Sequence, residues 1–178
     1  MGAREDLRGQ IKDKAVVHGR VTLSSGREAD YYVDLRRITL DAVASPLVGE
    51  VMLDLAADLQ FEAVGGLTLG ADPIAVAMLH TAAARGRALD AFVVRKQGKQ
   101  YGLQRRIEGP DVAGRRVLAV EDTSTTGGSV LTAVEALREA GAEVCGVAVI
   151  VDRGARVAVE AAGLRYVAAY EPGDLGLT

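Results

Sequence analysis

The sequence is poor in several features that define large classes of protein. Cys145 is the only cysteine among 178 residues, so an intrachain disulfide is impossible and a zinc site built on cysteines is excluded. Every apolar run is far shorter than the roughly 20 residues of a membrane-spanning helix. The first six residues, MGARED, lead into charged sequence rather than an apolar signal core. These absences predict a soluble, cytoplasmic protein that does not enter membranes.

An excess of basic charge is also missing. The formal net charge is −3 and the isoelectric point is about 5.5, whereas a dedicated nucleic-acid-binding domain is usually strongly basic. Hydrophobic residues make up 49% of the chain, which suits one well-filled domain of this length better than two. We therefore predict a single domain, residues 1–178, that binds no nucleic acid.

Apolar residues in the middle of the chain alternate between strand spacing and helix spacing. The predicted strands are 63–67, 91–94, 117–120 and 144–151, and the predicted helices are 45–59, 74–84 and 130–140. Repeated strand-helix-strand units form a parallel sheet covered by helices on both faces. The less regular ends are expected to cap the carboxyl edge of the sheet. The domain then consists of an N-terminal hood (1–42), an α/β core (43–157) and a C-terminal segment (158–178).

Residues 116–129, RVLAVEDTSTTGGS, are the most informative stretch. An apolar run ends in Glu121 and Asp122, at the position where open α/β sheets bind ligands. Hydroxyl residues and two glycines follow over 123–129 and lead into the predicted helix, whose N–H groups and dipole attract a phosphate. Carboxylates can accept hydrogen bonds from sugar hydroxyls, so acids beside a phosphate cradle indicate a ribose phosphate.

Two familiar phosphate loops do not match this stretch. A P-loop needs a lysine between its last glycine and the Ser or Thr, and no residue separates Gly128 from Ser129. A dinucleotide-binding loop has its acid about 20 residues after the glycines. Here Glu121 and Asp122 precede them. The remaining alternative is an ordinary strand-to-helix turn in which Thr and Ser cap the helix.

Residues 95–106, RKQGKQYGLQRR, form a second distinctive segment. The chain has four lysines against seventeen arginines, yet Lys96 and Lys99 both lie here. Five cations, two glycines and almost no aliphatic residue predict a mobile loop that closes over a polyanion. The alternative is a solvated hairpin whose charges only keep an exposed segment in water.

The 116–129 stretch resembles the phosphoribosyl diphosphate (PRPP) signature of the type I phosphoribosyltransferases. Three more segments, in the family's order, resemble the orotate phosphoribosyltransferases: LSSGREADYYVDLR at 23–36, the basic loop ending in IEG at 107–109, and VDR at 151–153. The resemblance implies a type I phosphoribosyltransferase-like α/β fold, a parallel sheet flanked by helices with a small hood formed by the N-terminal segment. It also implies a homodimer in which loop 95–106 of each subunit acts in its neighbour's active site.

The same resemblance implies a reaction. The 5-phosphoribosyl group of PRPP would pass to N1 of orotate, which releases pyrophosphate and forms orotidine 5′-monophosphate in pyrimidine biosynthesis. Charge builds on the leaving pyrophosphate, so the protein acts by electrostatics and positioning and needs no covalent nucleophile. Mg²⁺ is the implied cofactor, bound through PRPP without a direct protein ligand. Asp122 either acts on it through a water or holds the 3′-hydroxyl.

Residue by residue, the family pattern assigns three roles. The residues implied for catalysis are Arg95, Lys99 and Asp122. Those implied for PRPP binding are Arg95, Lys96, Lys99, Tyr101, Glu121, Asp122, Thr123, Ser124, Thr125, Thr126, Gly127, Gly128 and Ser129. Those implied for orotate are Tyr32, Val33, Thr125 and Arg153, with Arg153 meeting the carboxylate in bidentate geometry. The structural alternatives are a strand aromatic for Tyr32 and a strand-end cation for Arg153.

The chain departs from the family pattern at three places. Tyr101 stands where many members have His, Ser24 stands where some have Lys, and residues 68–71 lack a lysine found in other members. Tyrosine is neutral at pH 7, so the first departure argues against a mechanism that needs an imidazole in the loop.

Two rival functions remain open on sequence. A phosphoribosyltransferase for a purine or another base would share the PRPP signature but lack the 23–36 and 151–153 segments. A PRPP-sensing regulator would bind nucleic acid, against which stand the acidic isoelectric point and the absence of a recognisable helix-turn-helix or basic arm.

Overall fold

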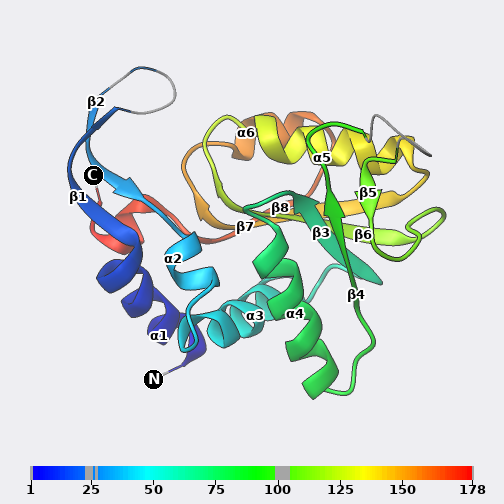
Figure 1. Cartoon of the computed structure of the whole chain (residues 1–178), viewed down its shortest axis with the longest axis horizontal. Coiled ribbons are helices and arrows are strands. Elements are labelled where there is room, and N and C mark those ends of the chain that lie inside the picture. The colour runs from blue at the N-terminus through cyan, green and yellow to red at the C-terminus, as the bar shows by residue number, and fades with distance from the viewer. Residues whose placement is uncertain (1, 23–25, 27, 99–104, 178) are drawn as a thin grey trace.

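The computed structural model describes residues 2–22, 26, 28–98 and 105–177. Its centre is a six-stranded sheet with the order β5-β4-β3-β6-β7-β8 (Figure 1). The strands are β3 (Ala63–Leu67), β4 (Asp90–Val94), β5 (Ile107–Glu108), β6 (Arg116–Ser124), β7 (Glu143–Asp152) and β8 (Tyr166–Tyr170). Neighbouring strands are parallel except for β4 and β5. The predicted α/β fold with a parallel sheet is confirmed.

Helices cover both faces of the sheet (Figure 1). On one face lie α1 (Ala3–Gln10), α3 (Ala44–Leu55) and α4 (Asp72–Ala84), and on the other lie α5 (Gly128–Glu139) and α6 (Arg156–Ala161). A hydrophobic core lies on each face of the sheet, and successive side chains of β6 enter alternate cores. Leu118 packs with the first group of helices and Val117 with the second. Burial on both faces explains why the central strands are almost continuously apolar.

The N-terminal segment forms a separate two-stranded hairpin that stands away from the sheet (Figure 1). After α1 come a short π-helix (Ile11–Ala15), β1 (Val16–Thr22), β2 (Glu28–Val33) and α2 (Arg36–Thr39). The hydroxyl of Tyr170 at the end of β8 donates to the carbonyl of Arg4 at 2.6 Å, which ties α1 to the edge of the sheet. A 3₁₀ turn (Pro172–Leu175) follows β8.

Four element predictions were wrong in detail. The helix predicted over 45–59 ends at Leu55. Leu59 lies in the turn that follows, where its side chain is buried and its N–H donates to the carbonyl of Ala56. The strand predicted over 117–120 continues to Ser124, because β7 supplies pairing partners as far as Asp152. Residues 107–108, predicted as loop, pair with β4. Residues 166–170, predicted as an irregular cap, form β8 at the edge of the sheet. None of the helices in the described ranges is long and apolar enough to cross a membrane.

Candidate active site

A cavity of about 620 Å³ lies at the carboxyl end of the sheet. Six parts of the chain line it: β2 with the start of α2, the turn after β3, Lys96 shortly after β4, the end of β6, the start of α5, and the turn after β7. This is the edge at which open α/β sheets bind ligands. The predicted residues that it brings together are Tyr32, Val33, Lys96, Glu121, Asp122, Thr123, Ser129 and Arg153.

The two adjacent acids form the floor of the site at the end of β6. Oε1 of Glu121 accepts the N–H of Asp122 at 3.1 Å, and Oδ1 of Asp122 accepts the N–H of Thr123 at 2.7 Å. Glu121 is only 6% exposed. Its burial, together with the charge of Asp122, raises its pKa to about 8. Glu121 is therefore mostly protonated at pH 7, and the pair can both donate to and accept from sugar hydroxyls.

The turn after β3 closes against these acids. A β-carbon on Gly70 would lie 2.4 Å from Oε1 of Glu121 and 3.0 Å from Oδ1 of Asp122, so only glycine fits without displacing them. The hydroxyl of Thr68 donates to Oδ2 of Asp72 at 2.6 Å, which joins this turn to the start of α4. The peptide bond between Thr68 and Leu69 is cis.

The loop from β6 to α5 presents its polar groups outward. Thr125, Thr126, Gly128 and Ser129 are exposed. The helix is capped by Gly127, whose φ of +81° is a left-handed conformation that favours glycine. A cap without a side chain does not match the alternative of a Ser- or Thr-capped turn. The N–H groups of the first turn of α5 therefore face a loop rich in hydroxyls, as a phosphate site requires.

Arg153 is placed by its neighbour Asp152. Oδ1 of the buried Asp152 accepts the N–H groups of Gly154 and Ala155, each at 2.9 Å. The N–H of Arg153 donates to the carbonyl of Ser124 at 2.8 Å. These bonds hold the turn after β7 against the end of β6, so the half-buried Arg153 faces the cavity from the β7 side.

Several predicted residues lie elsewhere. Arg95 is near Glu108, with 3.4 Å between Nη1 and Oε1, and within the described ranges it is not part of the cavity lining. Ser124 is buried in β6. Thr125, Thr126, Gly127 and Gly128 lie on the adjoining loop rather than in the cavity lining. Lys99, Tyr101 and Ser24 lie outside the described residues.

Sequence reasoning missed two parts of the cavity wall. One is the turn at 67–70, which follows a buried strand just as the acid pair does, so the strand-end rule could have found it. The other is Asp34 with Arg36, which were noted only as letters in the 23–36 segment. Nε of Arg36 donates to Oδ1 of Asp34 at 3.1 Å, and no sequence pattern predicts this pairing.

Comparisons with known proteins identify the family of the chain. A model of the phosphoribosyl transferase domain matches residues 65–167. The orotate phosphoribosyltransferase of Streptomyces avermitilis is 73% identical over 180 residues, which cover 97% of this chain and 99% of that protein.

Two crystal structures of Mycobacterium tuberculosis H37Rv orotate phosphoribosyltransferase are also similar. The complex with Fe(III) dicitrate has a TM-score of 0.90 at 58% identity, and the complex with PRPP has a TM-score of 0.87 at 53% identity. Each alignment covers 99% of this chain and 100% of the other. The fold and these relatives together show that the chain belongs to the orotate phosphoribosyltransferases, within the type I phosphoribosyltransferase family.

Proposed function

We propose that this protein transfers the 5-phosphoribosyl group from PRPP to orotate, which yields orotidine 5′-monophosphate and pyrophosphate. The observation that carries the proposal is that one cavity is lined by the acids Glu121 and Asp122, by the start of α5, and by cations from separate elements. That set matches a substrate with a ribose, several phosphates and an anionic base. Membership of the orotate phosphoribosyltransferases supports orotate as the acceptor.

The ribose is held at its hydroxyls by the acid pair, and the 5′-phosphate is held by the loop 123–129 and the first turn of α5. A half-protonated acid pair suits two neutral hydroxyls, because it supplies both acceptors and a donor. Thr125 and Thr126 are exposed on that loop and can reach a ligand outside the cavity floor. The ribose is thereby fixed with its C1 facing the open cavity.

Orotate binds on the β7 side of the acids. Arg153 pairs with its carboxylate, a planar match for a guanidinium, while Tyr32 and Val33 pack beside the ring. With C1 and N1 aligned, the bond from C1 to the pyrophosphate oxygen breaks as the N1–C1 bond forms. The electron pair leaves with pyrophosphate, which also takes up the proton that N1 loses. Lys96, and the loop residues Arg95 and Lys99, stabilise that charge.

Mg²⁺ fits this site as a partner of PRPP. An ion that binds phosphate oxygens and keeps several waters needs few direct protein ligands, and the cavity offers the carboxylate of Asp122 beside the protonated Glu121. Asp122 is the group placed to meet such an ion through water. When bound, Mg²⁺ would withdraw charge from the pyrophosphate.

A second cavity, of about 990 Å³, supports a homodimer. Leu40, Leu69 and Val76 on its wall are 73%, 69% and 47% exposed, and monomeric proteins seldom leave so much apolar side chain together. Leu69 and Arg36 line this cavity and the active site alike. A second copy seated here would lie beside the active site, as action of loop 95–106 across subunits requires. Val76→Asp should lower the oligomeric state in analytical ultracentrifugation.

The decisive experiment is the fall in orotate absorbance on adding PRPP and Mg²⁺, with and without the protein. Conversion of orotate, but not of hypoxanthine, adenine or uracil, is the expected result. Turnover of another base in place of orotate would favour the rival enzyme class. A gel shift at physiological salt, expected to be negative, tests the regulator. The cytoplasmic location stays a prediction.

A further inference from the structure

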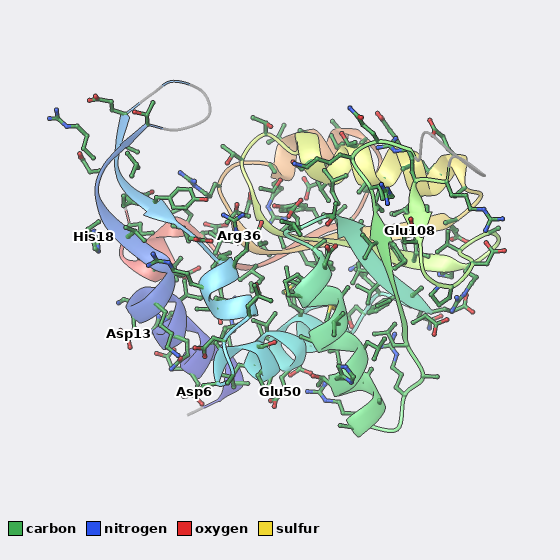
Figure 2. The ribbon with its side chains drawn as sticks, in the orientation of Figure 1. Asp6, Asp13, His18, Arg36, Glu50 and Glu108 are labelled. Atoms are coloured by element: carbon green, nitrogen blue, oxygen red, sulfur yellow. The ribbon has the colours of Figure 1, made fainter. Side chains whose placement is uncertain are left out.

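Arg36 is a cavity residue that the family pattern left without a role. It begins α2, between the N-terminal hairpin and the sheet (Figure 2). Its side chain is 49% exposed and lines the active-site cavity together with the acid pair. A cation in this position faces the substrate whether or not it takes part in the reaction.

The guanidinium is oriented and still able to bind an anion. Its Nε donates to Asp34, which uses one of the five N–H donors of the group and leaves the planar end for a ligand. The pKa of Arg36 is raised, first by the hydrogen bond and charge of Asp34 and then by Tyr32 and Asp122. Arg36 and Asp122 line the same cavity.

The order of the strands separates the cations of the site. The acid pair lies near the carboxyl end of β6, which has β3 on one side and β7 on the other. Arg153 follows β7. Arg36 instead lines the second cavity with Leu69 and Val76, which belong to the turn after β3 and to α4. Arg36 therefore lies on the β3 side, where Lys96 also follows the neighbouring β4.

This separation indicates which anion Arg36 meets. The orotate carboxylate is already matched by Arg153 on the β7 side, so the pyrophosphate of PRPP extends toward β3. The turn at 67–70, Leu-Thr-Leu-Gly, has no cationic side chain of its own. We propose that Arg36 binds the pyrophosphate of PRPP from the same subunit as the acid pair and stabilises it as it leaves C1. The proposal rests on the proposed function. Arg36 stays protonated throughout and transfers no proton.

Arg37 provides a matched control. Its Nε lies 3.9 Å from Oδ2 of the same Asp34 and its side chain is 57% exposed, yet it is not among the described residues that line either cavity. Arg36→Gln, Arg36→Lys and Arg37→Gln are compared by calorimetric titration with three probes: PRPP with Mg²⁺, pyrophosphate with Mg²⁺, and ribose 5-phosphate. The last probe reports whether the acid pair and the α5 loop remain intact.

Arg36→Gln should weaken binding of PRPP and of pyrophosphate about tenfold or more, as expected for loss of a charged hydrogen bond. Its affinity for ribose 5-phosphate should stay within about twofold of the native value, and Arg37→Gln should leave all three within the same limit. Arg36→Lys should recover part of the loss, because it restores the charge without the planar fork.

Two results would overturn the proposal: unchanged pyrophosphate affinity in Arg36→Gln, or an equal loss of affinity for ribose 5-phosphate. Failure of the proposed function can be distinguished from failure of the role proposed for Arg36. In that case the native protein converts no orotate, while the pyrophosphate titrations still decide the role of Arg36.

Discussion

Gly70 lies against Glu121 so closely that a β-carbon on residue 70 would stand 2.4 Å from the carboxyl oxygen Oε1. The turn after β3 thus forms a wall for an acid that belongs to β6. β3 and β6 are distant in sequence but adjacent in the sheet, and together they position the carboxyl group of Glu121.

Gly70→Ala should displace the acid pair. Because the added carbon would also lie 3.0 Å from Oδ1 of Asp122, we expect PRPP affinity to fall roughly tenfold or more and stability to fall by about 1–3 kcal/mol. Calorimetry and urea denaturation measure the two effects. Gly9→Ala in α1 is the control, since a β-carbon there meets nothing within 4 Å and alanine favours the helix. Native PRPP affinity in Gly70→Ala would show that the turn does not position the acids.

Glu121 should make the protein less stable as pH rises. Its pKa is about 8 in the folded protein against an ordinary 4.5, so between these values the unfolded chain loses a proton that the folded chain keeps. The contribution is fully present below pH 4.5 and is lost as pH rises toward 8, with a slope of at most about 1.4 kcal/mol per pH unit. Denaturation of native protein and Glu121→Gln from pH 5 to 8.5 should show a shallower dependence in the variant. Parallel curves would contradict the buried, protonated Glu121.

Loop action across the dimer can be tested by mixing inactive variants. Lys99→Ala should depress kcat by about 10²–10³, as removal of a preorganised charge does. Asp122→Asn should lose about 1.5–3 kcal/mol of PRPP binding. A hybrid dimer contains one site in which both residues are native, so the mixture should regain activity. If subunit exchange is demonstrated and no activity returns, the loop acts within its own subunit.

Tyr101→Phe should be a mild change, about tenfold or less in kcat/KM, because it removes one neutral hydrogen bond of roughly 1 kcal/mol. The native loop should add no titration near neutral pH, whereas Tyr101→His should introduce a limb between roughly pH 5.5 and 7.5. The measurement is kcat/KM for PRPP against pH in all three proteins. A thousandfold loss in Tyr101→Phe would make the hydroxyl an essential catalytic group.

Sequence predictions that rest on neighbouring residues were more accurate than those that depend on residues distant in the chain. The alternation of strands and helices and the place of the ligand edge were predictable, because apolar periodicity and the acids at 121–122 are local signals. The ends of elements were less predictable. β6 runs four residues past its predicted end at 120 because β7 offers hydrogen-bond partners there, and this depends on a strand about twenty residues later.

By itself, the sequence determined the α/β class, the family resemblance and the run of acids, hydroxyls and glycines at 121–129, since each is written in contiguous residues. Only the tertiary structure decided that Gly70 lies against Glu121, that burial keeps this acid protonated, and that Arg36 and Arg153 line one cavity with the acids. The physical reason is that desolvation and charge separation depend on which elements meet in space. That depends on the order of the strands, which does not follow their order along the chain.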